Sequence, residues 1–280
     1  KDAEKDYDSI IEFRGGRTDN LFDDLPYDQL SDQWQGIHLT TESFGNNFEF
    51  CDIRNGRYGI KADSSNVEEL KIAVLSSKIQ NTTGHLLELN NCYTTFGNSL
   101  IVNAGGNCIN INGGRHKFTF CTIANFYVWR QRDVALALHN SIDGVPAPLN
   151  RALFANCVIV GSREDEVMGY LNSLGDSLQS AANYRFENSL VNTVDVADSC
   201  FVDVRYDSLA VEPFGKSHFR LVDNDIFDYD FHLTAESTAR GIASDAYLSG
   251  LPVDIDGVTR EAGAVDAGCF QYVEEIESGS

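Results

Sequence analysis

A five-residue phrase that recurs along the chain constrains its fold more than any other feature. Each copy places a small residue, a branched aliphatic residue and an asparagine at positions i, i+2 and i+4. The clear copies are CDIRN at residues 51–55, SKIQN at 77–81, SLIVN at 99–103 and CTIAN at 121–125. Their isoleucines are 26, 22 and 22 residues apart, and weaker copies follow at 157–161 and 188–192. Because positions i, i+2 and i+4 of a strand share one face, the phrase predicts strands that stack like residues over like.

Two further strand patterns accompany each copy of the phrase. Alternating apolar residues precede it, as at Leu70, Ile72 and Val74, and a short apolar strand follows after a turn, as at residues 85–89. Three short strands per 22–26 residues predict an all-β parallel β-helix, a solenoid of stacked coils. The apolar period of two excludes stacked helix pairs, and the LxxLxL phrase of leucine-rich repeats is absent.

The small and asparagine positions of the phrase are predicted to be structural. Stacked asparagines tolerate left-handed backbone and hydrogen-bond their neighbours, so we expect an asparagine ladder at residues 55, 81, 103 and 125. Cys51, Cys121 and Cys157 occupy the small position and are expected to be buried thiols. Disulfides between coils stay open among the seven cysteines, and a zinc site is not expected because no CxxC spacing occurs.

The spacing of the phrase also predicts the domain organisation. After residue 125 the intervals lengthen to 36 and 31 residues, which predicts insertions near 126–150 and 161–183 in the C-terminal half. We expect an N-terminal segment at 1–33, one β-helix domain at 34–272 and a polar tail at 273–280. Loops that project from a rigid scaffold are where solenoids carry function.

Charge and hydropathy exclude two classes of partner. The chain has 42 acidic and 21 basic residues and a net charge of −21, so it lacks the positive charge that binds nucleic acid. No apolar run reaches the 18 residues typical of a membrane-spanning helix. The sequence begins at Lys1 within a polar stretch and contains no signal peptide, so we interpret it as a mature or trimmed chain.

Several motifs in this order resemble one protein family. They are WQGI at 34–37, the Ile-x-Asn coils, GGRHKFTFCTIAN at 113–125, and DGxxR at 256–260 followed by DxG at 266–268. Over residues 30–272 the chain resembles right-handed, pectate-lyase-like parallel β-helix proteins that are secreted or lipid-anchored in Bacteroidetes-type bacteria. The resemblance implies an extracytoplasmic location, secreted or at the outer membrane and cell surface, with any lipid anchor outside this chain. It implies little about activity, because such proteins include polysaccharide lyases, hydrolases and non-catalytic modules.

The chain departs from that family pattern in two places. Family members have more β-helix before the WxGI phrase, so residues 1–33 are interpreted as the remnant of a longer helix. The residues Cys269, Phe270 and Gln271 stand where Ala-Tyr-Glu is usual, which puts an acidic role at Gln271 in doubt.

A basic window is the main candidate for a binding site. No acidic residue occurs between Glu88 and Asp133. The candidate glycan-binding residues in or beside this window are Arg115, His116, Lys117, Tyr127, Trp129, Arg130, Arg132 and His139. Arginine pairs bidentately with carboxylate, and tyrosine or tryptophan stacks on a sugar face. If the turn and the insertion converge on one side, they form a patch for an acidic glycan. The alternative is a solvated turn and a loop that packs on the solenoid.

Two acidic groups are further candidates. Asp223, Asp225, Asp228 and Asp230 are weak candidates for Ca²⁺, although their spacing does not follow the EF-hand loop, and the alternative is a charged turn before the last strand. The set Asp254, Asp256, Arg260 and Asp266 is expected to close the C-terminal end of the solenoid through turns and ion pairs. No cofactor is required, and Ca²⁺ is the one cofactor considered.

No catalytic motif of the GxSxG, HExxH, P-loop or dinucleotide type occurs. The leading hypothesis is therefore an exported, glycan-interacting protein without catalysis. The first alternative is a polysaccharide lyase or glycoside hydrolase on an acidic polysaccharide, in which Lys117, His116 or Arg130 removes the α-proton. The second is a structural or partner-binding component of an outer-membrane assembly that meets another outer-membrane protein.

Overall fold

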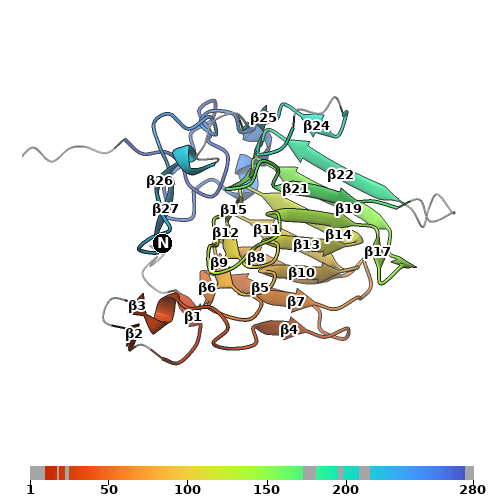
Figure 1. Ribbon diagram of the computed structural model, residues 1–280. Helices are drawn as coiled ribbons and strands as arrows, with labels where there is room; N and C mark the ends of the chain where they lie inside the picture. The colour runs from red at the N-terminus through yellow and green to blue at the C-terminus, as the bar shows by residue number, and fades with distance from the viewer. Residues whose placement is uncertain are drawn as a thin grey trace, which may run out of the picture.

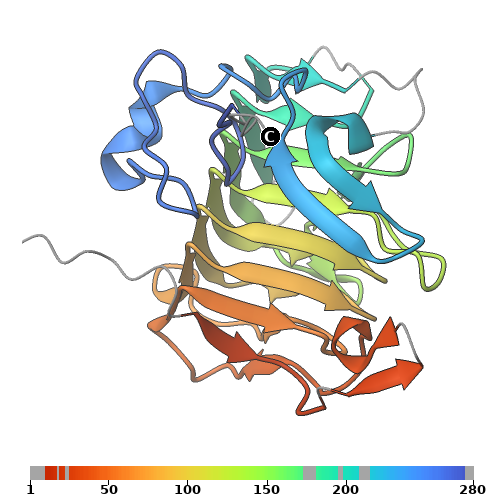
Figure 2. The same cartoon turned by 90° about the vertical axis from the view of Figure 1, so that its left-hand side faces the viewer.

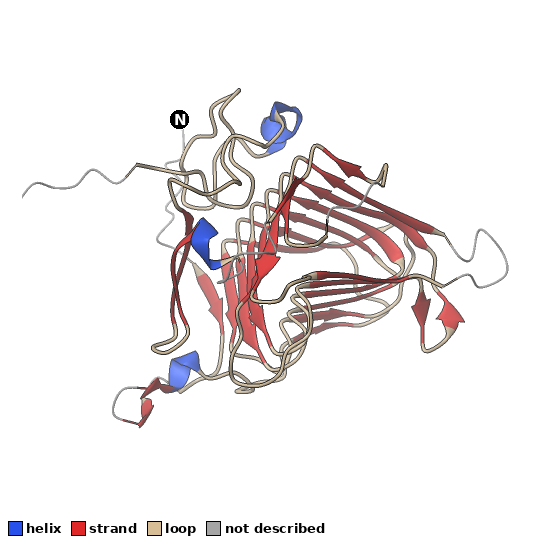
Figure 3. Cartoon of the chain, turned by 45° about the horizontal axis from the view of Figure 1, so that its top comes forward, coloured by secondary structure: helices blue, strands red, loops and turns tan. Residues whose placement is uncertain are grey.

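Three parallel sheets form the body of the molecule. The structure is a computed structural model that describes residues 10–17, 19–22, 25–172, 181–194, 198–207 and 215–274. The chain visits the three sheets in turn, and all pairings within them are parallel in the described residues (Figure 1). Seen from above, the sheets form the sides of a triangle (Figure 3). This all-β arrangement is the one expected of a parallel β-helix.

Each sheet stacks one strand per coil. Sheet 1 contains, in spatial order, β1 (Ile11–Phe13), β6 (Cys51–Arg54), β9 (Lys78–Thr82), β12 (Leu100–Ala104), β15 (Thr122–Asn125), β20 (Val158–Gly161), β23 (Leu190–Val191) and β25 (Arg205–Tyr206). Sheet 2 contains β21 (Val167–Tyr170), β16 (Leu136–His139), β13 (Ile109–Asn112), β10 (Leu87–Asn90), β7 (Ile60–Ala62) and β4 (Ile37–Leu39). Sheet 3 contains β24 (Phe201–Val202), β22 (Ala182–Glu187), β19 (Leu149–Ala155), β14 (Gly114–Thr119), β11 (Tyr93–Gly97), β8 (Leu70–Leu75) and β5 (Asn46–Glu49).

Three hairpins and three short helices lie outside the three parallel sheets in the described residues. The hairpins pair β2 (Asn20–Phe22) with β3 (Leu25–Pro26), β17 (Ser141–Ile142) with β18 (Val145–Pro146), and β26 (Phe219–Asp223) with β27 (Asp228–Leu233). The 3-10 helices are η1 (Tyr27–Gln29), η2 (Lys216–His218) and η3 (Asp245–Gly250). In the part of the chain that the structure describes, no helix is long and apolar enough to cross a membrane.

The repeated phrase forms the strands of sheet 1, as its alternation predicts. The isoleucines of the first five copies pair in register and are fully buried; they are Ile53, Ile79, Ile101, Ile123 and Ile159. The sixth copy is displaced by one residue, because Val191 pairs with Ile159 and Leu190 faces outward over Val158. Ser189 is therefore the small residue of that copy, and the alignment of Leu190 with the isoleucines is wrong.

The small position has a specific role at the corner between sheets 3 and 1. The residue before it turns the chain with a left-handed backbone, as at Asn98 with φ 51°. The Ser99 hydroxyl then donates to the Gly97 carbonyl at 2.7 Å and accepts the Ser77 N–H at 3.3 Å. A short side chain with a polar hydrogen can bridge this tight turn, so serine and cysteine both fit. All seven cysteines are free thiols, and six of them are buried.

The asparagine ladder holds in the first coils and changes where the insertions begin. Asn55, Asn81 and Asn103 have left-handed φ values of 64°, 55° and 66°. The amide of Asn81 donates to the side-chain oxygen of Asn55 at 2.8 Å. Asn125 departs from this pattern, since its buried side chain binds the N–H and carbonyl of Ala104 in the preceding coil. It thus anchors the start of the loop that follows.

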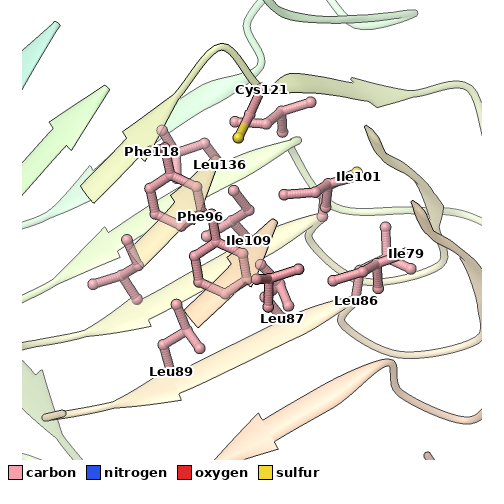
Figure 4. Close-up of a cluster of buried hydrophobic side chains, with 14 of the residues drawn as sticks. Ile79, Leu86, Leu87, Leu89, Phe96, Ile101, Ile109, Phe118, Cys121 and Leu136 are labelled. Carbon is pink, nitrogen blue, oxygen red and sulfur yellow. The ribbon is translucent and has the colours of Figure 1, made fainter. Parts of the chain in front are cut away.

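The interior of the solenoid is a set of like-on-like stacks. One ladder on sheet 3 consists of the rings of Phe96, Phe118, Phe154, Phe186 and Phe201, with successive centroids 4.7, 4.9, 5.0 and 4.7 Å apart. These distances match the spacing of neighbouring strands. Figure 4 shows Phe96 and Phe118 within a cluster that also contains aliphatic side chains such as Ile101 and Leu136. The core therefore joins all three sheets along the axis.

The predicted insertions take a different form from one another. The stretch 126–150 is not a single insertion, because β16 lies within it and divides it into a loop at 126–135 and the β17–β18 hairpin region. Part of the second stretch, 173–180, lies outside the described residues.

The C-terminal segment, residues 215–274, covers one side of the solenoid. Its buried residues pack on the outward-facing side chains of sheet 1, and these sheet residues are Leu100, Val102, Ala124, Val158, Val160 and Leu190. Arg260 donates to Asn98 at 2.8 Å, and the Cys269 N–H donates to Thr122 at 3.0 Å, both in middle coils. Asp254 does form a turn, since it accepts the N–H groups of Asp256 and Val258, but the expectation that the set Asp254, Asp256, Arg260 and Asp266 closes the end of the solenoid is wrong. An apolar outer face on sheet 1 requires lateral cover, which this segment provides.

Candidate functional site

The outer face of sheet 1 changes character along the axis and leaves a groove. In β6 and β9 the outward residues are polar, namely Asp52, Arg54, Lys78 and Gln80. The later strands turn apolar residues outward, and the C-terminal segment covers these (Figure 2). The polar part stays open as a groove of about 430 Å³, here named the sheet-1 groove.

Aromatic side chains from two distant loops form one margin of the sheet-1 groove. Tyr127 and Trp129 come from the loop after β15, and Phe227 comes from the turn of the β26–β27 hairpin. The rings of Trp129 and Phe227 stack with centroids 4.3 Å apart, and Trp129 keeps 41% of its surface exposed. The Tyr127 hydroxyl shares a 2.8 Å hydrogen bond with Ser31. The stacked rings of Trp129 and Phe227 thus present a fixed aromatic surface beside the groove.

A histidine held between two carboxylates also lines the groove. His232 Nδ1 binds Asp230, and Nε2 binds Asp256 at 2.7 Å. The hydrogen bond to Asp256, together with Asp230, raises the pKa of His232 despite its partial burial. The same bond lowers the pKa of Asp256. With both ring nitrogens hydrogen-bonded to carboxylates, the contacts of His232 favour its cationic form.

Among the described residues, the floor of the groove contains paired charges and one cation, Lys78, that lacks a close ion pair. Gln80 donates to Asp52 at 2.9 Å, and Arg54 lies 3.6 Å from the same carboxylate. Burial raises the pKa of the Asp52 carboxyl. Lys78 makes no hydrogen bond or ion pair within 4 Å with any described residue, and its charge interacts at longer range with Asp52 and Asp256. Its ammonium is therefore available to a ligand.

The structure separates the predicted glycan-binding residues onto different faces. Arg115 and Lys117 point outward from sheet 3, whereas His116 between them is fully buried. His116 binds Thr94 at 2.8 Å and the Gly113 carbonyl at 2.7 Å, and burial lowers its pKa to about 4. Strand alternation accounts for this split. The trio is therefore not a single cluster.

The remaining predicted residues also diverge. Arg132 is buried in an ion pair with Glu166 at 2.5 Å, and exposed Arg130 lies against the Gly105 turn. His139 stacks on Tyr170 at 4.6 Å and lines a separate depression on sheet 2. Of the eight candidates, only Tyr127 and Trp129 reach the sheet-1 groove. The expectation that the turn and the insertion converge on one side is wrong, because three sheets face three directions.

The four calcium candidates take separate roles around the β26–β27 hairpin. Asp223 accepts the N–H groups of Asp225 and Ile226 and so shapes the turn. Asp228 lines the sheet-1 groove, and Asp230 binds His232. Within the described ranges, no group of three or more His, Cys, Asp or Glu side chains is placed to hold a metal ion. These contacts agree with the alternative of a charged turn, and Ca²⁺ binding stays a prediction.

One signal in the sequence points to the groove floor, and the basic window points to Tyr127 and Trp129 at its margin, but none points to His232. Positions i+1 and i+3 of the phrase face outward, and they are polar in the first two copies and apolar in the next. This change marks Lys78 and its neighbours. His232 and Asp230 are about 150 residues away in the chain, and no local pattern connects them to the floor.

No family model matches this sequence, and a search of the curated proteins finds no match. The geometry of the site is therefore the basis for its interpretation.

Proposed function

We propose that this protein binds a glycan chain in the sheet-1 groove without chemically altering it. The observation that carries the proposal is the exposed Trp129–Phe227 pair beside a floor of hydrogen-bonding side chains. A sugar ring has an apolar face that packs on an aromatic ring and hydroxyl groups that need polar partners. Gln80 and Asp228 supply such partners, and Lys78 supplies a cation for an acidic sugar.

The charges in the groove favour binding over catalysis. Asp230 and His232 are engaged with each other, and Asp256 holds the second ring nitrogen. A general base needs a free lone pair within reach of the substrate proton. Both ring nitrogens of His232 are engaged by carboxylates, so His232 offers none, and the cluster supports the hairpin wall.

A polysaccharide lyase is the second candidate, and Lys78 is the observation that favours it. The Lys78 side chain, as the neutral amine, would have the lone pair that proton abstraction needs. Incubation of an acidic polysaccharide with the protein tests this candidate through the ultraviolet absorbance of unsaturated ends. Product formed by the natural protein and lost in Lys78→Ala would support the lyase and refute a purely binding role.

In keeping with the family resemblance, we further propose a right-handed, pectate-lyase-like helix exported to the bacterial surface. Fractionation of the producing cells tests the location, since protein found in the cytoplasm would contradict it. An outer-membrane partner is a further prediction, to be checked by crosslinking on intact cells.

A glycan array with matched variants tests the binding proposal. We expect Trp129→Ala to weaken binding by about tenfold or more, since a buried aromatic contact commonly contributes more than 1 kcal/mol. Tyr170→Ala is the control, because Tyr170 is 50% exposed and lies on sheet 2. Unchanged binding in Trp129→Ala, a loss in Tyr170→Ala alone, or no glycan bound by the natural protein would each overturn the proposal.

A further inference from the structure

A cluster of cations covers part of the outer face of sheet 3. Its members come from three adjacent strands, and we name them the basic face: Arg115 and Lys117 of β14, Arg151 of β19 and Arg185 of β22. The chain has twice as many acidic as basic residues, 42 against 21. A local excess of positive charge therefore runs against its composition.

The strand register brings these cations close together. Arg115 pairs directly with Arg151, after an irregularity in the register that lies just before Arg115. In the next outward column Lys117 pairs with Leu153, and Leu153 pairs with Arg185. Neighbouring strands are about 4.8 Å apart, and like charges on directly paired residues destabilise a sheet. Folding alone gives no reason to place Arg151 against Arg115.

The carboxylates near the basic face do not neutralise all of its positive charge. Arg115 pairs with Glu68 at 3.0 Å, but the Glu68 side chain is 66% exposed, so this ion pair is weak. Arg185 pairs with Glu187, which also accepts the Tyr247 hydroxyl at 2.5 Å. The described residues offer neither Lys117 nor Arg151 a hydrogen bond or an ion pair within 4 Å, and Arg151 interacts at longer range with Glu187 and Tyr247. Four cations thus face two carboxylates.

Two tyrosines support the basic face. The Arg115 guanidinium lies 5.6 Å from the ring of Tyr93, and the Lys117 ammonium lies 5.6 Å from the ring of Tyr247. Such contacts attract a cation without neutralising it. The C-terminal segment lies against part of this face, with Leu251 against Gly97 and Tyr247 between Lys117 and Glu187. Leu153 is buried in the column between Lys117 and Arg185. Lys117, Arg151 and Arg185 remain exposed.

We propose that the basic face binds an acidic glycan through its carboxylate or sulfate groups, separately from the sheet-1 groove. The planar guanidinium groups of Arg115 and Arg151 suit bidentate contacts with such groups. The cations follow successive coils, so one chain that lies along the axis meets several of them. A bound anion between Arg115 and Arg151 also relieves their repulsion. Nucleic acid is the rival polyanion, and single-stranded DNA in the binding experiment distinguishes the two.

Binding to immobilised polygalacturonate and heparin tests this proposal, with dextran as the neutral polymer and single-stranded DNA as the rival polyanion. The variant is Lys117→Gln/Arg151→Gln in the full chain. The control is Arg57→Gln/Arg205→Gln, which removes the same charge from exposed positions elsewhere. We expect the first variant to weaken binding to at least one acidic polymer by about tenfold, the control to retain it, and dextran to show none.

The other outcomes are equally decisive. Equal losses in the two double variants would show a general charge effect and overturn the proposal, as would DNA binding as tight as polysaccharide binding or no binding to either acidic polymer. Preference for polygalacturonate identifies carboxylate as the recognised group, and preference for heparin identifies sulfate. Trp129→Ala is expected to keep this binding, so failure of the sheet-1 groove proposal and failure of this one are distinguishable.

Discussion

The buried ion pair between Arg132 and Glu166 allows a sharp test of a residue that the sequence presents as a glycan ligand. Glu166 is fully buried and Arg132 is 7% exposed. The Glu166 carboxylate accepts two bonds from Arg132, at 3.0 and 2.5 Å, and two from the N–H groups of Ala135 and Arg163, at 2.8 and 2.9 Å. The substitution Arg132→Met keeps much of the side-chain volume and removes two of these four bonds.

The expected loss of stability follows from these contacts. Hydrogen bonds to a charged group contribute about 1.5–3 kcal/mol each, so two bonds amount to about 3–6 kcal/mol. Breaking a buried ion pair from one side costs about 3–5 kcal/mol, in agreement with that sum. We therefore expect Arg132→Met to lower the free energy of unfolding by about 3–5 kcal/mol at neutral pH. Glycan binding, measured at a temperature at which the variant is fully folded, should stay unchanged.

Urea denaturation followed by circular dichroism measures the loss, and the double variant Arg132→Met/Glu166→Gln provides the control. Glutamine removes the unpaired charge and keeps an acceptor for one of the two backbone N–H groups, which bind different carboxylate oxygens. Because the buried charge is the larger cost, the double variant should be more stable than Arg132→Met alone. A loss below about 1 kcal/mol, typical of an exposed ion pair, would refute the reasoning. So would a double variant that is less stable than the single one.

The pH dependence gives an independent check with a definite sign. Burial raises the pKa of Glu166, and the bonds from Arg132 oppose this effect. Without Arg132 the pKa of the folded state rises further above that of the unfolded chain. Stability from a raised carboxyl pKa is present below the unfolded value and is lost as pH rises through the folded value. The deficit of Arg132→Met should therefore be small in acid and grow toward neutral pH.

Three further predictions concern the core, the groove and the thiols. Phe118→Ala should cost about 3–5 kcal/mol in urea denaturation because it interrupts a fully buried ring stack, whereas Phe118→Leu should cost less; equal costs would contradict the stack. NMR titration should place the pKa of His232 above 6.5, and Asp256→Asn should lower this pKa. The stabilising effect of the contact should be lost as pH rises through the pKa of the folded protein. An unchanged pKa in Asp256→Asn would exclude the contact. A thiol reagent should label only half-buried Cys200 in the native protein and all seven cysteines in denaturant, and labelling of several native thiols would contradict the fold.

Local patterns predict the coils well and the site poorly. The phrase identifies the inward isoleucines because alternation in a strand is a property of neighbouring residues. It loses its register at Leu190, where the copy is weak and the shift by one residue exchanges inside for outside. Trp129 was a candidate from its chain position, but its partner Phe227 is about 100 residues away, and no periodicity links them.

The sequence by itself determines the stack: period, strand pattern and small corner residues specify three short strands per coil and the side chains that fill the interior. Those features act between neighbours along the chain or between successive coils, so each copy specifies its own local structure. Only the tertiary structure decides which outer faces are covered and which are open. The C-terminal segment packs on the apolar half of sheet 1 and leaves the polar half as a groove, while the register of sheet 3 gathers Arg115, Arg151 and Arg185 on one exposed face. Burial of apolar surface drives that long-range choice, and it depends on the whole folded shape rather than on any local pattern.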